Sequence, residues 1–110
     1  MTHELEALTA PLSAAAPCGS DLEYTPLLAT FDAYRLFGSD YPPAADTDWR
    51  AIRDNSLLGL AQSRDLRLLA HLAAALIRIE GLTTFSNLIT VAERWLTEYW
   101  DQVFPRIDED

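Results

Sequence analysis

Residues 66–79 are the most apolar stretch of the chain, and their spacing constrains the fold more than any other feature. Only Arg67, His71 and Arg78 are polar within it, and at about 100° per residue these three fall close together on one side of a helix. Apolar side chains cover the rest of the circumference. A helix that is apolar almost all round is buried by neighbours on several sides. We therefore predict an all-α fold, a single-domain bundle of about five helices around a central apolar helix at residues 65–80.

The segment Ser63-Arg64-Asp65-Leu66-Arg67 opens this helix. Asp65 is predicted to cap its start, with Arg64 and Arg67 as adjacent counter-charges. The alternative is that an arginine here binds a carboxylate of a partner protein. We favour a pair within the domain for Arg67, and its candidate partners are Asp48, Asp65 and Asp101. Gly81 is predicted to end the helix by adopting a left-handed conformation.

Four further helices follow from periodicity and capping signals. They are expected at His3–Leu12, from Thr25-Pro26 to Gly38, from Asp46 or Thr47 to about Gln62, and from Thr83 or Thr84 to Pro105. In the third of these, Trp49, Ile52, Leu57 and Leu60 should face inward, and Arg53 on their flank should have a carboxylate partner. The last helix carries its apolar residues in one arc about 140° wide: Phe85, Leu88, Ile89, Ala92, Trp95, Leu96, Tyr99, Trp100 and Val103. Core packing is the expected role of most of the aromatic residues, and Trp100 could also anchor a partner at the end of the arc.

Two loops connect these helices. Ser13–Tyr24 is predicted to be a linker inside the domain, either ordered or a flexible tether. Gly38–Thr47 contains Tyr41, Pro42 and Pro43, which favour extended polyproline geometry. We interpret it as a surface connector, with partner binding as the alternative.

The composition excludes several classes of function. The chain has 110 residues, which suits one domain, and a net charge of −9 with no lysine. Its eight arginines are scattered, so it lacks the basic surface that nucleic acid or an anionic membrane requires. No apolar run approaches the ~20 residues that span a membrane, and the N-terminus does not resemble a signal peptide. Cys18 is the only cysteine, so no internal disulfide can form. We expect a cytoplasmic protein without membrane insertion.

The sequence offers little support for catalysis or metal binding. Cys18 and His71 could be imagined as nucleophile and base, but nothing near His71 in sequence would orient it, so we interpret it as a structural histidine. The only other histidine is His3, and the acidic pairs and the acidic tail do not have the spacing of a calcium loop. We predict no catalytic, cofactor-binding or metal-binding residue.

Several short motifs carry a resemblance to a known family. They are Pro17-Cys18-Gly19 followed by Asp21-Leu22 and Tyr24; Asp48-Trp49; Ser63-Arg64-Asp65-Leu66-Arg67; Leu76, Arg78 and Gly81-Leu82; and Tyr99-Trp100-Asp101 followed by Val103, Pro105 and Ile107-Asp108. In this order and spacing the chain resembles, over residues 5–110, the ImpA N-terminal domain of the TssA proteins of bacterial type VI secretion systems.

This resemblance implies a non-enzymatic helical module of a cytoplasmic bacterial protein that acts in baseplate assembly and in priming the tail tube and sheath. Its partners would be other baseplate and tail proteins. Family members continue into a C-terminal region that forms homo-oligomeric rings, so residues 1–110 are interpreted as a fragment of a longer protein. From the residues alone, the alternative is a structural self-association domain of an unrelated helical protein.

Overall fold

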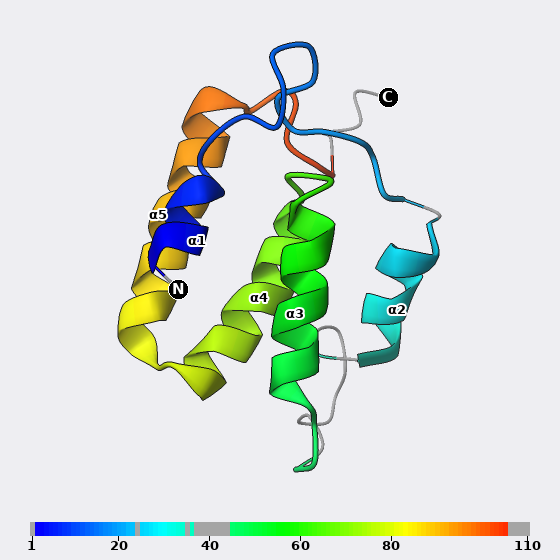
Figure 1. Ribbon diagram of the computed structural model, residues 1–110, viewed down its shortest axis with the longest axis vertical. Coiled ribbons are helices and arrows are strands. Elements are labelled where there is room, and N and C mark those ends of the chain that lie inside the picture. The colour runs from blue at the N-terminus through cyan, green and yellow to red at the C-terminus, as the bar shows by residue number, and fades with distance from the viewer. Residues whose placement is uncertain (1, 24, 35, 37–44, 106–110) are drawn as a thin grey trace.

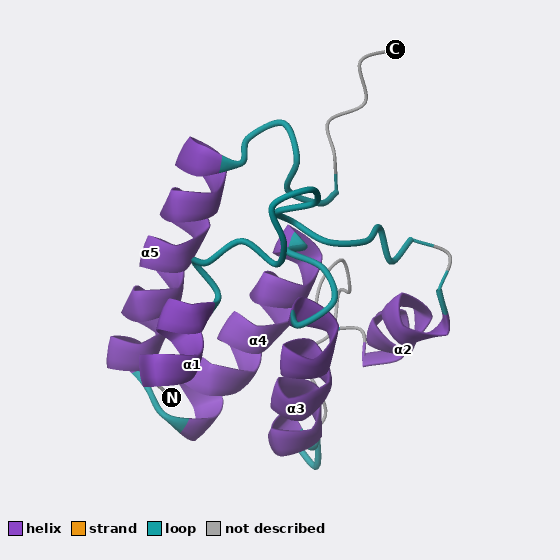
Figure 2. Cartoon of the chain, turned by 45° about the horizontal axis from the view of Figure 1, so that its top comes forward, coloured by secondary structure: helices purple, strands orange, loops and turns teal. Residues whose placement is uncertain are grey.

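The protein is an all-α domain of five described helices. The computed structural model describes residues 2–23, 25–34, 36 and 45–105. The helices are α1 (Thr2–Ala7), α2 (Pro26–Tyr34), α3 (Trp49–Leu60), α4 (Leu66–Ile79) and α5 (Leu82–Glu98). Helix α4 lies between α3 and α5, α1 lies against α5, and α2 lies beside α3 on the side of the molecule away from α5 (Figures 1 and 2). The predicted fold class, with its central apolar helix, is confirmed.

Helix α4 starts and ends as local chemistry dictates. The Asp65 carboxylate accepts a hydrogen bond from the backbone N–H of Arg67 at 2.8 Å and so satisfies one of the free donors at the helix start. At the other end Gly81 has a φ of 95°, which a residue with a Cβ rarely adopts. The chain reverses there, and α5 begins at once with Leu82. The prediction that Thr83 or Thr84 caps α5 is wrong. Gly81 occupies the cap position, and since glycine has no side chain, no side-chain hydrogen bond caps this helix.

Helix α4 is central, but it is not enclosed on all sides. Leu68, Leu72 and Leu76 are buried in the core, together with Leu69 and Ala75. On the opposite face Ala70 is exposed, and Ala73, Ala74 and Ile77 are only half-buried. The prediction of burial on all sides is therefore wrong for this face, because no other segment in the described part of the chain lies over it.

The buried face of α5 is rotated from the predicted arc. Leu88, Val91 and Trp95 are buried, and Val91 was outside the prediction. By contrast Ile89, Leu96 and Trp100 are exposed, although the prediction placed them in the arc. Helix α1 packs against α5 and helps to decide which face is inside: the indole of Trp95 donates to the Leu8 carbonyl at the end of α1.

The segment 13–23 is an ordered loop that packs on the domain. Cys18 and Leu22 are buried, and Gly19 forms an isolated bridge with Ser63. The Ser20 N–H donates to the Gln62 carbonyl at 3.1 Å. Three helix ends also differ from the prediction: α1 ends at Ala7, α3 ends at Leu60, and α5 ends at Glu98 rather than at Pro105. The predicted end of α2 at Gly38 lies outside the described residues.

Candidate interaction surface

Arg64 joins four segments of the chain at the start of α4. Its side chain is 6% exposed, and its guanidinium donates to the carbonyl oxygens of Leu60 at 2.8 Å and of Ala7 and Ala10 at 3.1 Å. Its backbone N–H donates to the Cys18 carbonyl, and its own carbonyl accepts from Phe104. Burial lowers the pKa of Arg64, and attraction from Cys18 and Tyr99 opposes this shift. Arg64 thus binds carbonyl groups at helix ends rather than a partner's carboxylate.

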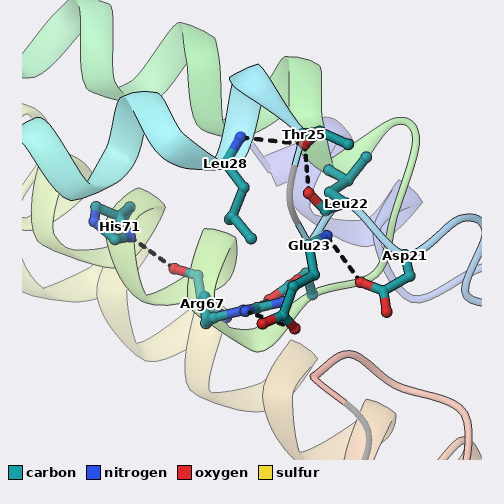
Figure 3. A network of polar contacts seen from close by, with 8 residues as sticks. Asp21, Leu22, Glu23, Thr25, Leu28, Arg67 and His71 are labelled. Carbon is teal, nitrogen blue, oxygen red and sulfur yellow. Dashed lines mark hydrogen bonds and ion pairs between the residues drawn. The ribbon is translucent and has the colours of Figure 1, made fainter.

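Asp65 and Arg67 form an ion pair at the same junction. The Asp65 carboxylate is fully buried and receives two bonds from the Arg67 guanidinium, at 2.8 and 3.1 Å. Glu23 from the loop lies 3.6 Å from the same guanidinium (Figure 3). The hydrogen bonds that the Arg67 guanidinium donates to Asp65 raise the pKa of Arg67, against a smaller opposing effect of burial. Of the three partners considered for Arg67 from sequence, the structure selects Asp65.

His71 sits on the side of α4 that faces α2. Its Nδ1 lies 2.8 Å from the Arg67 carbonyl oxygen, and because that oxygen can only accept, Nδ1 carries the proton (Figure 3). The ring packs edge-on against Phe31 of α2, with centroids 4.9 Å apart. Cys18, imagined as a nucleophile, is buried beside Arg64. These contacts suit structural roles for both residues.

Asp48 and Trp49 stand at the start of α3. The Asp48 carboxylate caps the helix by accepting from the Ala51 N–H at 3.0 Å. Trp49 is half-buried rather than fully inside, and the Arg78 guanidinium of α4 lies over its ring, 4.5 Å from the centroid. Arg53 pairs with its neighbour Asp54 at 2.9 Å.

The C-terminal aromatic motif is split between the core and the surface. Tyr99 is half-buried against the core, whereas Trp100 is 57% exposed. Asp101 is exposed, and no cap or ion pair joins it to another described residue. The loop residues Tyr41, Pro42 and Pro43, which sequence suggested for partner binding, lie outside the described residues.

An apolar groove of 370 Å³ lies between α4 and α5, and sequence reasoning missed it. Its walls are Leu66, Leu69, Ala70, Ala73, Ala74 and Ile77 of α4 and Phe85, Leu88, Ile89 and Ala92 of α5. Exposed Leu82 and Leu96 continue the α5 wall at either end. Patches of this kind on a small domain are typical of interaction sites.

The described residues contain no group of three or more His, Cys, Asp or Glu side chains that could hold a metal ion. None of the described helices has the length and hydropathy needed to cross a membrane.

Comparison with known proteins identifies the family. The family model described as "ImpA, N-terminal, type VI secretion system" matches residues 9–110. The chain belongs to this family. This ImpA N-terminal domain is 28% identical over 113 aligned positions to the type VI secretion system component TssA1 of Pseudomonas aeruginosa, which confirms the resemblance to TssA proteins.

A solved structure agrees with the fold of this ImpA N-terminal domain. It is the N-terminal domain, including the conserved ImpA_N region, of the TssA component from Burkholderia cenocepacia. The TM-score is 0.78 at 28% identity, and the match covers 96% of this chain. The chain spans 33% of the length of the P. aeruginosa protein and 41% of the solved B. cenocepacia chain.

Proposed function

We propose that this chain is a non-enzymatic protein–protein interaction module of a TssA-type component, acting in the bacterial cytoplasm in baseplate assembly and in priming the tail tube and sheath. Its partners would be other baseplate and tail proteins of the type VI secretion system. Membership of the ImpA N-terminal family supports the setting. The ring formation known in the wider family would belong to a C-terminal region outside this chain.

The main support for the proposal is that charged motif residues bind within the domain while large apolar side chains are exposed. The charged residues of the Ser63-Arg64-Asp65-Leu66-Arg67 motif all bind groups within the domain. Large apolar side chains are instead left on the surface, among them Trp100. A domain whose charged motif residues bind groups inside the domain, and which exposes an aromatic side chain, is suited to binding proteins, because Trp side chains are frequent anchors of interfaces.

Trp100 gives a direct test, and Leu58 of α3 provides a matched control because both side chains are 57% exposed. Binding of the chain to purified baseplate and tail proteins of its own secretion system is measured by calorimetry. We expect Trp100→Ala to weaken binding at least about tenfold, as an interface anchor would, and Leu58→Ala to leave it unchanged. Binding to none of these proteins would reject the proposal. Binding with equal affinity by both variants would reject Trp100 as the anchor.

The Tyr41–Ala44 loop is the second part of the proposed docking surface. A deletion of these four residues that keeps the helical circular-dichroism spectrum should also weaken binding. Undiminished affinity in that folded variant would remove the loop from the proposed surface.

A further inference from the structure

A second apolar stripe runs along the outer side of α5, separate from its buried face. It consists of Leu82, Phe85, Ile89, Ala92 and Leu96. The steps between these residues alternate between three and four, which is the repeat of helices that pack side by side in coiled coils and bundles. Leu82 is 72% exposed and Ile89 is 54% exposed, and Phe85 and Ala92 are half-buried. The repeat therefore faces outward and has no helix against it in the described chain.

Helix α4 carries a matching stripe on the other wall of the same groove. Leu66, Ala70, Ala73 and Ile77 follow one another in steps of four, three and four, and all four line the groove. A pair of connected helices whose repeats face one open groove is half of a four-helix bundle, in which such positions of all four helices fill the core.

We propose that this face is closed by the same face of a second copy of the chain, so that two α4–α5 hairpins form an antiparallel four-helix bundle about a two-fold axis. A two-fold interface requires a surface that is complementary to itself. From Phe85 to Leu96 the steps of the α5 stripe are four, three and four, and these read the same in both directions. In an antiparallel pair Phe85 therefore lies opposite Leu96 of the second copy, and the large Ile89 lies opposite the small Ala92.

The charges beside the stripe permit this arrangement. On the outward flank of the α5 stripe the repeat places Ser86 and Glu93. In the antiparallel pair Glu93 faces Ser86 of the second copy, so no two carboxylates are directly opposite. The net charge of −9 on each copy still opposes association over longer distances. Added salt screens this repulsion, so the dimer should become tighter as the salt concentration rises.

The test is the mass of the 110-residue chain in solution, measured by sedimentation velocity over a concentration series. We expect the mass to rise toward that of a dimer, and more readily at higher salt. Ile89→Glu, at the centre of the stripe, should weaken dimerisation at least about tenfold. Leu58→Glu on α3 should leave dimerisation unchanged, although Leu58 is about as exposed as Ile89. Circular dichroism and thermal melting check that both variants are folded.

A chain that stays monomeric at every concentration would overturn the proposal, and so would an equal loss of dimer in both variants. The proposal would also be overturned if the chain stayed monomeric and its groove bound a basic amphipathic helical peptide with an affinity that falls as salt is added. The groove would then be a site for a helix of another protein. This inference is independent of the partner binding proposed above, because Ile89→Glu leaves Trp100 in place.

Cross-linking tests the antiparallel direction. When Phe85→Cys and Leu96→Cys variants are mixed under mild oxidation, the bundle predicts disulfides between the two different variants. Disulfides that form instead within each variant alone would overturn the antiparallel arrangement. The native Cys18 is buried and serves as an internal background in the unmodified chain.

Discussion

The indole Nε1–H of Trp95 donates to the carbonyl oxygen of Leu8 at 2.7 Å and so fastens the end of α1 to α5. Trp95 is fully buried, and Leu5 and Leu8 belong to the same core. Helix α1 has six residues, far fewer than the ~12 that make an isolated helix even marginally stable in water. Its order therefore depends on packing against α5.

Trp95→Phe tests this dependence. The substitution removes the indole donor and leaves the buried Leu8 carbonyl without it, which should cost about 1–3 kcal/mol of unfolding free energy in urea titrations. Amide hydrogens of α1 and the following turn should exchange faster than those of α3. Trp100→Phe is the control and should change stability by less than about 0.5 kcal/mol, because this side chain is largely exposed. Equal effects of the two substitutions would argue against the bond as a fastening of α1.

Arg64→Met should be more damaging than the loss of any surface arginine. It leaves the carbonyls of Ala7, Ala10 and Leu60 without their shared charged donor, and the expected loss is about 3 kcal/mol or more by denaturant unfolding. Arg64→Lys should recover part of that loss, since one ammonium cannot reproduce the planar fork of donors. Arg50→Met changes an exposed arginine of α3 and should be nearly neutral. If Arg64→Met were as mild as Arg50→Met, Arg64 would not be holding these segments together.

Substitutions at Gly19 and Gly81 distinguish the cost of backbone strain from the cost of a steric clash. Both have positive φ, of 77° and 95°. A Cβ at Gly19 would lie 2.2 Å from the Gln62 carbonyl oxygen, whereas at Gly81 it would meet open space. Gly81→Ala should therefore cost about 1–3 kcal/mol from backbone strain alone, and Gly19→Ala should cost more because the loop must also move away from Gln62. Melting temperatures in the reverse order would contradict the close packing of this loop on Ser63.

The sequence was sufficient for the helices but not for how they face one another. Hydrophobic periodicity and caps such as Asp65 are local signals, and they located all five helices, although α1 and α5 end well before the predicted Leu12 and Pro105. Trp95 could be assigned to the core for the same reason. Val91 could not, because the positions of α1 and α4 against α5 decide which side of a doubly apolar helix is inside.

The roles of Arg64 and of the groove depended on contacts between distant segments. Two of the carbonyls that Arg64 binds are 54 and 57 residues away in the chain, and no local pattern indicates them. The outward stripe was different, because the steps from Leu82 to Leu96 were already visible in the sequence. The prediction of one broad arc combined this stripe with the buried face, and only the structure separates the two.

Three substitutions in α4 measure how far its two faces differ. Leu72 and Leu76 are fully buried, so changing either to Ala should cost about 2–5 kcal/mol from lost burial and the cavity left behind. Ile77 follows Leu76 directly but lines the open groove and is half-buried, so Ile77→Ala should cost only about 1 kcal/mol in the monomer, roughly half the value of a fully buried side chain. The measurement is urea unfolding at a protein concentration where sedimentation shows a monomer.

A loss below about 1 kcal/mol for both leucines would mean that α4 is not the centre of the core. A loss for Ile77→Ala as large as that for Leu76→Ala would mean that the groove is closed in the monomer, because only an enclosed side chain loses that much on truncation.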